Sequence, residues 1–353
     1  MRIGPEPLEQ LVTRIFEAAG CPPGEAACVA RHLVSANLCG HDSHGVIRVA
    51  QYVSGLKEGT IHVGQQITTT FESETVAVID GHMGFGQSIG EQAMALLAKK
   101  ARRSGLGLIA LGNTYHVGRG GDWAEQLAEE GLISIHFVST TGRGLFAVPF
   151  GGTDRRLSLC VIAACVPVEG RPPILLDCAT TVTAEGKLRV AKNKGIAVPP
   201  GQIVDKQGNP TIDPNDFYDG GAVLTMGGHK GFGLNVIADL LAGVLSGMGC
   251  TKPGVDTMVN TMTSIAIDPG PMTDREAYVA EVKRFSDWVR GSPPRDPGSE
   301  VQMPGDFEHR TRAERRRGGI PTDDETWRQI VETGVLLGLP RGDFDEVSSG
   351  RVG

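Results

Sequence analysis

The sequence lacks the cysteine pattern of a disulfide framework or of a zinc site. Its seven cysteines are scattered along the chain, their number is odd, and no Cys-x-x-Cys pair occurs. We therefore expect reduced thiols, a cytoplasmic protein and no metal. Cys178 is the one cysteine in a stretch of functional interest, and a small buried side chain is the simpler interpretation of it.

Long apolar runs and a basic field are also missing. No apolar run is long enough to cross a membrane, and residues 1–5 do not open a signal peptide. The net charge is −7, and the one basic run, at 310–317, is short and interrupted by Glu314. We expect neither a membrane nor a nucleic acid as a partner.

The composition is that of an ordinary globular protein. Of 353 residues, 40% are hydrophobic and 21% are charged, which suggests two domains or one large domain with an excursion. Hydrophobic periodicity predicts helices near both ends of the chain and an α/β region between them. The expected helices are 6–19, 24–39, 45–58, 90–104, 122–130, 234–245, 273–290 and 322–337. The expected strands are 75–80, 106–111, 132–138, 174–177 and 264–267, with loops at 195–224 and 291–305.

Residues 40–48, followed by Tyr52, form the stretch around which the chain is organised. Asp42 or Ser43 suits the N-cap of a helix that begins near Gly45 and ends near Gly59. On such a helix His44, Arg48 and Tyr52 would share one face, because they are spaced by four residues. Arg48 could hold a carboxylate in two-point geometry while His44 passes a proton. The alternative is a polar helix start with an exposed histidine and a surface ion pair.

Polar residues follow three of the expected strands. His116 comes after the second strand, residues 139–141 after the third, and residues 177–181 after the strand at 174–177. Ligands of α/β sheets collect at the carboxyl ends of strands, so we expect the working surface there. Each signal is weak alone, since Ser/Thr runs are usually plain turns.

Two glycine-rich stretches differ in what they predict. Residues 84–90 do not match a dinucleotide fingerprint, because the third glycine comes one residue late and no acidic residue ends a strand at the expected distance. A strand-to-helix turn explains them better. Residues 227–233 combine glycines, Lys230 and a helix start, which suits a phosphate or pyrophosphate. A glycine turn that begins a core helix is the structural alternative.

Taken together, the motifs resemble the second type of malate/L-lactate dehydrogenases, a group that includes ureidoglycolate and sulfolactate dehydrogenases, diketogulonate reductase and cyclic imino acid reductases. The resemblance covers nearly the whole chain. It rests on His41-Asp42-Ser43-His44-Gly45-Val46-x-Arg48 with Tyr52, Asp80-Gly81, Gly84-x-Gly86, His116-Val117-Gly118, Phe150-Gly151-Gly152, Asp177-x-Ala179-Thr180, residues 208–214, Gly228-His229-Lys230-Gly231-Phe232-Gly233 and Pro304-Gly305-Asp306.

The resemblance implies an NAD(P)-dependent oxidoreductase of small 2-hydroxy or 2-oxo acids, which is usually a homodimer. In fold it implies an α/β protein, with a non-Rossmann NAD(P)-binding sheet domain at 71–305 and a helical substrate and dimerisation domain at 1–70 plus 306–353. The sequence does not choose between NAD and NADP.

The resemblance also implies site residues. His44 and His116 are both candidates for the proton donor or acceptor, and Asp177 is implied near the nicotinamide or near His44. Substrate contacts are implied for Ser43 and Arg48, and we expect Tyr52, which shares their predicted face, to contact the substrate as well. Cofactor contacts are implied for Ser139, Thr140, Leu176, Asp177, Cys178, Ala179, Thr180, Lys230, Gly231, Pro304, Gly305 and Asp306.

Two departures from the family pattern bear on the substrate. Residues 157–161 replace a common Gly-Thr-Asn-Pro and remove polar side chains from an expected wall of the site. Asp306 stands where glutamate is common, a change of one methylene. Reduction of a cyclic imino acid therefore stays open as an alternative, as does a non-catalytic ligand-binding protein on the same scaffold.

A helix N-terminus lowers the pKa of a histidine, so a protonated His44 would need a carboxylate nearby. We expect Asp177 to be that partner.

Overall fold

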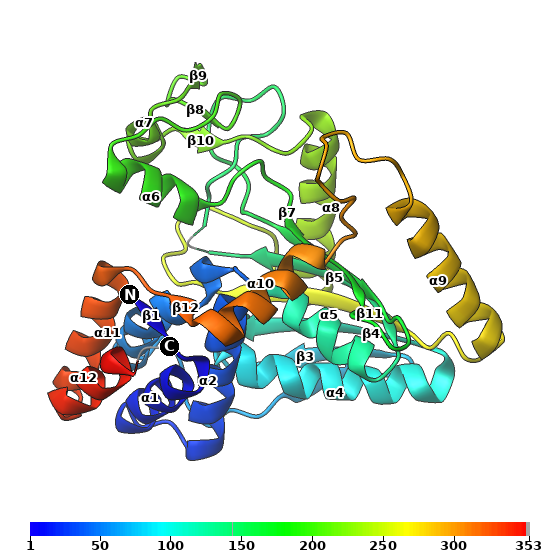
Figure 1. The fold of residues 1–353 in the computed structure, drawn as a ribbon, viewed down its shortest axis with the longest axis horizontal. Coiled ribbons are helices and arrows are strands. Elements are labelled where there is room, and N and C mark those ends of the chain that lie inside the picture. The colour runs from blue at the N-terminus through cyan, green and yellow to red at the C-terminus, as the bar shows by residue number, and fades with distance from the viewer. Residues whose placement is uncertain (143, 351–353) are drawn as a thin grey trace.

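A computed structural model describes residues 1–142 and 144–350, and a seven-stranded mixed sheet forms its centre (Figure 1). The strands lie in the order β2-β3-β4-β11-β5-β6-β7. Their bounds are Thr68–Glu72 (β2), Val76–Asp80 (β3), Leu106–Thr114 (β4), Ile133–Thr140 (β5), Val161–Val166 (β6), Ile174–Ala179 (β7) and Asn260–Ile267 (β11). All five predicted strands are confirmed, and the mixed α/β class with them.

Strand direction brings the predicted site segments to one edge. β3 and β4 pair in parallel, whereas β11 lies between β4 and β5 and is antiparallel to both. β6 is antiparallel to β5 and to β7. Consequently β3, β4, β5 and β7 run in the same direction, and their carboxyl ends meet at the same edge of the sheet.

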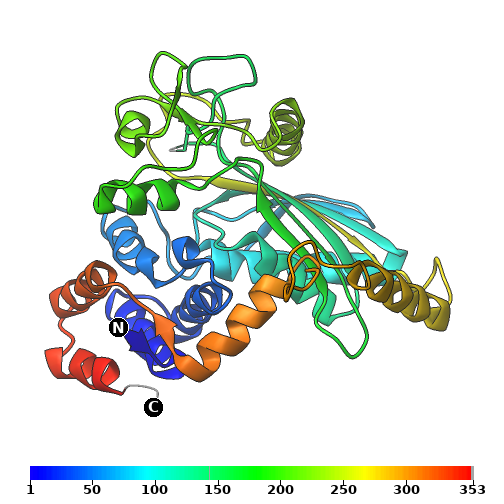
Figure 2. The same cartoon turned by 45° about the horizontal axis from the view of Figure 1, so that its top comes forward.

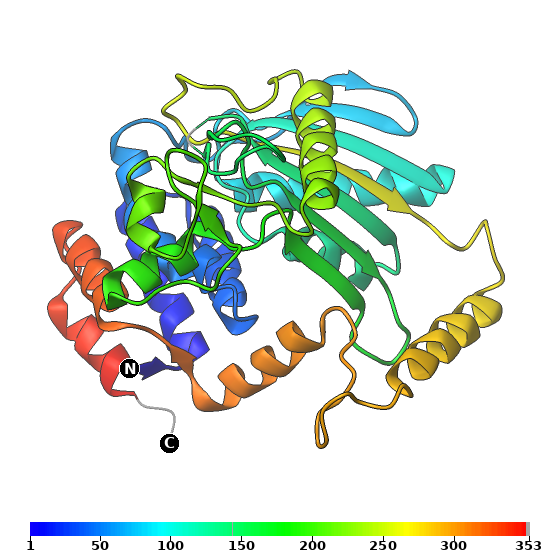
Figure 3. The same cartoon turned by 90° about the horizontal axis from the view of Figure 1, so that it is seen from above.

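Helices cover both faces of this sheet (Figure 3). α4 (Gly86–Ser104) and α5 (Gly120–Glu129) lie on one face, and α8 (His229–Leu245) lies on the other. Glycines of β4 make room for both layers. A β-carbon on Gly107 would lie 2.9 Å from Leu97 of α4, and one on Gly112 would lie 2.6 Å from Met248, just after α8.

Helices from the two ends of the chain pack into one body beside the sheet (Figure 2). β1 (Arg2–Ile3) pairs with β12 (Ile320–Pro321), which fixes the ends together. Residues of both ends share one apolar core. The helices are α1 (Pro5–Ala18), α2 (Pro23–Leu38), α3 (Val49–Lys57), α10 (Asp306–Gly318), α11 (Asp324–Leu336) and α12 (Arg341–Ser349). The predicted helices at 6–19, 24–39 and 322–337 are confirmed.

The region expected as loop at 195–224 contains a three-stranded sheet, so that prediction was wrong. β8 (Ile203–Val204), β9 (Pro210–Thr211) and β10 (Ala222–Val223) have two residues each, which is too short for a periodic pattern. α6 (Glu185–Lys194) and α7 (Pro214–Tyr218) accompany them. α9 (Arg275–Arg290) confirms the helix expected at 273–290 and extends away from the sheet (Figure 1).

The helix expected from Gly45 is not continuous. Two 3₁₀ turns, Asp42–His44 and Val46–Arg48, precede α3, and neither Asp42 nor Ser43 caps it. The amide oxygen of Asn37 instead accepts a hydrogen bond from the backbone N–H of Val46 at 2.8 Å. A β-carbon on Gly45 would lie 2.2 Å from that oxygen, so glycine is required here.

Strand ends also lie further along the chain than expected. Ser139 and Thr140 lie inside β5, and residues 177–179 lie inside β7, because β11 and β6 continue the pairing. The sequence also missed β2, β6, α6, α10 and α12. α10 has no buried residue and three arginines in its last turn, so it shows no apolar face. The predicted domain boundary at residue 70 falls inside β2.

In the described ranges no helix has the length and apolar character that a membrane span requires.

A buried histidine between strands makes stability depend on pH. His136 of β5 is 0% exposed, and its two ring nitrogens bond to the hydroxyls of Ser264 and Ser134. Burial lowers its pKa to about 3, so the folded protein keeps it neutral where the unfolded chain takes up a proton. Stability contributed by a neutral His136 is therefore lost as the pH falls below about 6.5.

We expect His136→Gln to reduce this pH dependence. Between pH 6.5 and pH 5 the wild type should lose about 1.6 kcal/mol more unfolding free energy than the variant. Denaturant unfolding at both pH values measures this difference, and any constant cost of the substitution cancels. Equal losses in the two proteins would contradict it.

Candidate active site

Two histidines from distant parts of the chain meet at the centre of the site. His44 is the last residue of the first 3₁₀ turn, and His116 follows β4. Their rings are parallel with centroids 5.2 Å apart, and Nδ1 of His44 lies 3.2 Å from Nε2 of His116. His116 is 7% exposed, whereas His44 is half-buried. The structure thus brings together the two proton-transfer candidates that the sequence could only name separately.

Tyr52 and Gln87 continue this contact into the protein. The hydroxyl of Tyr52 lies 2.6 Å from Nδ1 of His116, and Nε2 of Gln87 donates to the same hydroxyl at 2.9 Å. Tyr52 and Gln87 are both fully buried. Gln87, Tyr52, His116 and His44 form one chain of hydrogen bonds, which we call the proton chain.

Charge and burial fix how many protons this chain holds, and the orientation of the Gln87 amide fixes where they lie. Burial, the charge of Arg48 and that of His41 lower the pKa of His44 to about 3. Burial, Arg48 and His44 likewise keep the pKa of His116 well below its usual value. Both rings are therefore neutral at pH 7, with one N–H each. Since Gln87 donates to Tyr52, the tyrosine donates to His116, His116 donates to His44, and the remaining proton of His44 lies on Nε2.

Arg48 lies beside this pair and is held by its neighbours. Its Nε donates to the backbone carbonyl of Ser43 at 2.7 Å, and Nη1 donates to Gln51 at 2.7 Å. Burial lowers the pKa of the guanidinium, which nonetheless stays charged at pH 7. α6 approaches the same turn, since a β-carbon on Gly186 would lie 3.4 Å from that of Ser43.

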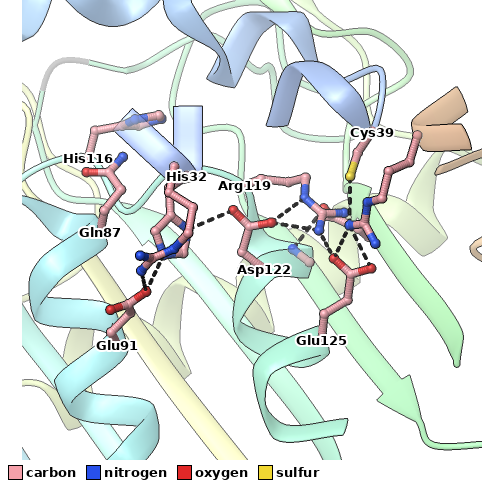
Figure 4. A network of polar contacts seen from close by, with 12 residues as sticks. His32, Cys39, Gln87, Glu91, His116, Arg119, Asp122 and Glu125 are labelled. Atoms are coloured by element: carbon pink, nitrogen blue, oxygen red, sulfur yellow. Dashed lines mark hydrogen bonds and ion pairs between the residues drawn. The ribbon is translucent and has the colours of Figure 1, made fainter. Parts of the chain in front are cut away.

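A buried ion network supports the segment that carries His116 (Figure 4). Arg119, at 1% exposure, pairs with Asp122 at 2.7 Å and with Glu125. Asp122 also bonds to His32 of α2 at 3.0 Å. Burial would raise the pKa of Asp122, but Arg119 and His32 outweigh it and hold that pKa well below its usual value. This network joins the start of α5 to α2.

Asp177 does not pair with His44, so the partnership expected from the sequence was wrong. Its carboxylate accepts a hydrogen bond from the backbone N–H of Gly121 at 2.8 Å. Burial raises its pKa, which the nearby charges of His41 and Arg119 partly offset. A β-carbon on Gly121 would lie 2.8 Å from this carboxylate, so glycine permits the contact. A place for Asp177 near the nicotinamide stays a prediction.

The cofactor candidates on β5 and β7 fall into two groups. Ser139 and Thr180 are buried and bond within the protein, Ser139 to Asp239 at 2.6 Å and Thr180 to the carbonyl of Cys160 at 3.0 Å. Thr140 is half-buried and accepts from Asn260 at 2.9 Å. Of the others, Leu176 is exposed and Cys178 and Ala179 are half-buried. Of these candidates, only the second group has side chains that are open to solvent.

Residues 157–161 form part of the protein interior near these strands. Ser158 and Cys160 are both buried, and their side chains bond to Ser139 or to each other. The carbonyl of Ser158 accepts from Asn235 of α8 at 2.9 Å. The altered residues thus connect β5 to α8 in the protein interior. They do not only line the expected wall of the site.

The last candidates lie at the start of α8 and of α10. Lys230 is exposed, and Gly231 is required because a β-carbon there would lie 2.1 Å from the carbonyl of Met226. The carbonyl of Pro304 accepts from the N–H of Leu175 at 3.1 Å, which joins this loop to β7. Gly305 precedes α10 with φ +95°. Asp306 is the first residue of α10 and pairs with Arg290 at 2.6 Å.

Comparison with known proteins identifies the family. A family model described as malate/L-lactate dehydrogenase matches residues 3–331. The chain belongs to this family. Hydroxycarboxylate dehydrogenase B of Escherichia coli (strain K12) is 37% identical over 346 residues, which is 96% of this chain and 95% of that protein. The resemblance found in the motifs is thereby confirmed, and with it the prediction of a dehydrogenase.

Solved structures agree with this assignment. Sulfolactate dehydrogenase from Methanocaldococcus jannaschii has a TM-score of 0.89 at 32% identity, and the match covers 97% of this chain and 99% of that one. Δ1-Piperideine-2-carboxylate reductase from Pseudomonas syringae has a TM-score of 0.83 at 28% identity, with 94% and 99% covered.

Sequence reasoning missed two residues of the site in this member of the malate/L-lactate dehydrogenase family. Gln87 lies in the first turn of α4, directly after the glycines that were interpreted as a strand-to-helix turn. Gly86 brings this turn close to the histidine, because a β-carbon there would lie 2.3 Å from the carbonyl of His116. Asn37, whose side chain shapes the turn at Gly45, belongs to none of the sequence motifs. A polar residue in the first turn of a helix after a strand end was the available signal for Gln87.

We expect Tyr52→Phe to interrupt the proton chain while leaving substrate binding intact. The ring would still pack against Phe16 and Phe85, but His116 and Gln87 would lose their common partner. Turnover should fall about tenfold or more with little change in KM, because Arg48 is untouched. Steady-state kinetics measure both quantities.

Tyr278→Phe is the matched control, since among the described residues that hydroxyl bonds only to the carbonyl of Pro167, at 3.1 Å. Unchanged turnover in Tyr52→Phe would show that the hydroxyl has no part in proton transfer.

Proposed function

We propose that this protein transfers a hydride between a nicotinamide cofactor, NAD or NADP, and a small 2-hydroxy or 2-oxo acid. One observation carries the proposal: the proton chain ends at His44, next to the guanidinium of Arg48, in a chain of the malate/L-lactate dehydrogenase family. A cation for the carboxylate and a proton source for the neighbouring oxygen are what such an acid requires.

The residues at the start of α8 fit a pyrophosphate. Gly227 and Gly228 have positive φ, at +59° and +62°, and precede a 17-residue helix whose first turn carries Lys230. Backbone N–H groups and one lysine at a helix N-terminus attract phosphate oxygens. Lys230 and Gly231 would hold this part of the cofactor, and the residues at 176–179 would lie along it. When bound, NAD(P)H supplies the hydride.

The chain's own residues do the rest. Arg48, with Ser43 beside it, would bind the carboxylate and orient the carbonyl, and His44 would donate its Nε2 proton to the oxygen that becomes a hydroxyl. The substrate carboxylate would offset the charge of Arg48, one of the causes of the low pKa of His44. Binding would therefore raise that pKa and favour the acid form.

The remaining expectations stay proposals with their own support. A homodimer is supported by an exposed apolar face on α8, formed by Leu234, Ile237, Leu240, Val244 and Leu245. The division into a helical domain (1–70 plus 306–353) and a non-Rossmann NAD(P)-binding domain (71–305) is supported by an apolar core to which the chain ends contribute all buried residues but Phe85 and Tyr115. A cytoplasmic location is supported by seven free cysteines.

A cyclic imino acid is the second candidate substrate. The likeness to the Pseudomonas syringae reductase favours it, at a TM-score of 0.83. The nitrogen of such a substrate is already protonated, so the general acid would matter less. A non-catalytic binding protein is the third possibility, but the retained Ser43, His44, Arg48, His116 and Lys230 argue against it.

The first test is oxidation of NADH and NADPH against a panel of 2-oxo acids and cyclic imino acids. We expect turnover with a 2-oxo acid. Turnover with cyclic imino acids alone would select the second candidate. Failure to bind either cofactor would favour a non-catalytic protein and overturn the proposal.

His44→Ala tests the proton donor. We expect turnover to fall about a hundredfold or more, without unfolding. His62→Ala is the matched control, because His62 is exposed, bonds to the backbone carbonyl of His82 at 2.9 Å and takes no part in the proton chain. Near-normal turnover in His44→Ala would move the donor to His116. A pH–rate profile that stays flat would favour imine reduction.

A further inference from the structure

A cluster of three metal-ligating side chains lies apart from the proton chain. Cys28 and His32 lie on α2, and Glu91 lies on α4. One potential ligand atom from each, a sulfur, a ring nitrogen and a carboxylate oxygen, lies within 4.8 Å of the other two. Cys28 is buried, while His32 and Glu91 are half-buried.

The helices explain why these three atoms converge. Cys28 and His32 are four residues apart, so they lie one above the other on the same face of α2. That face packs towards α4, where Glu91 completes the group. Nε2 of His32 lies 2.9 Å from Oε1 of Glu91. The distances are short enough for one ion to contact all three after small side-chain shifts.

A fourth residue orients the imidazole. Nδ1 of His32 lies 3.0 Å from Oδ2 of Asp122, which is 8% exposed (Figure 4). Metal-binding histidines commonly donate their second ring N–H to a carboxylate, which selects the tautomer and turns the other nitrogen to the ion. Asp122 imposes this arrangement here, with Nε2 facing Glu91.

We propose that Cys28, His32 and Glu91 bind one thiophilic divalent cation of the Zn²⁺ class, with Asp122 holding the imidazole in place. Sulfur, nitrogen and oxygen ligands in this number suit zinc, with a water as fourth ligand. A cavity of about 630 Å³ that is lined by His32, Glu91 and Asp122 gives the ion and the water a path from solvent. The prediction of no metal considered only Cys-x-x-Cys pairs, and a Cys-x-x-x-His pair on a helix escapes that criterion.

Coordination balances charge within the cluster. The ion forms bonds to the thiolate, the neutral imidazole and the carboxylate, so the thiol proton and the proton of Nε2 pass to solvent. Two negative ligands then face a doubly positive ion. Arg31 pairs with Oε1 of Glu91, the same oxygen that lies near Nε2 of His32, so the ion would share this carboxylate with Arg31.

The site would link three different parts of the fold. α2 belongs to the helical body, α4 covers the sheet, and Asp122 lies in the first turn of α5, six residues after His116. A bound ion would therefore stabilise the contact between the helical body and the sheet. This inference does not depend on the proposed dehydrogenase activity.

Titration of the full-length, metal-free protein with Co²⁺ tests the proposal, because a cobalt–thiolate bond gives a charge-transfer absorption. We expect one Co²⁺ per chain, displaceable by Zn²⁺, with this absorption in the wild type. Cys28→Ser should lose the absorption, and Glu91→Gln should bind about tenfold more weakly or worse. Cys21→Ser is the matched control, since Cys21 is 5% exposed and Cys28 is 7% exposed.

Thermal unfolding gives a second measurement. Zn²⁺ should raise the Tm of the wild type and of Cys21→Ser, because it binds only the folded state, and should not raise that of Cys28→Ser. No stoichiometric binding by the wild type, or binding and absorption that survive in Cys28→Ser, would overturn the proposal. Glu91→Gln, at a half-buried position, keeps the test decisive if Cys28→Ser fails to fold.

Discussion

The buried guanidinium of Arg119 is the interaction on which the site depends most. Arg119 lies only three residues after His116, and it pairs with Asp122 and Glu125 of α5. These two carboxylates in turn bond to a histidine of α2 and an arginine of α10. Loss of one member would leave charges buried without a partner, which typically costs about 3–5 kcal/mol. The position of His116 therefore depends on ion pairs as well as on apolar packing.

Before a substrate binds, the site holds two neutral histidines beside the fixed charge of Arg48. Burial and Arg48 together keep both rings uncharged at neutral pH. A carboxylate that binds to Arg48 would offset the guanidinium charge that helps to lower the pKa of His44. This pKa would therefore rise as the complex forms. The acid needed for oxo-acid reduction would then be produced by binding itself. Without substrate, Arg48 would be the main charged group of the site. The neutral histidines would add little attraction for other anions.

The sequence predicted most helices and five of the seven strands of the central sheet, because long apolar periodicities leave few alternatives. It also predicted His44, Arg48, Tyr52 and His116, since their residue types suit the chemistry. It failed where one distant side chain decides the local backbone: a spacing of four residues indicates a helix, but Asn37 of α2 holds this turn in two 3₁₀ pieces. The partner expected for His44 was wrong for a similar reason, because strand pairing turns that carboxylate towards α5.

Gln87 has an amide oxygen that is buried without a hydrogen-bond partner among the described residues, while its nitrogen donates to Tyr52. Rotation of the Gln87 amide by a half-turn places its oxygen, an acceptor, where its nitrogen, a donor, lies. Tyr52 would then donate to Gln87, His116 would donate to Tyr52, and His44 would present a lone pair in place of a proton. The same four residues thus have two protonation patterns with opposite donor directions. One pattern suits reduction and the other suits oxidation. Rotation of the buried Gln87 amide interconverts them.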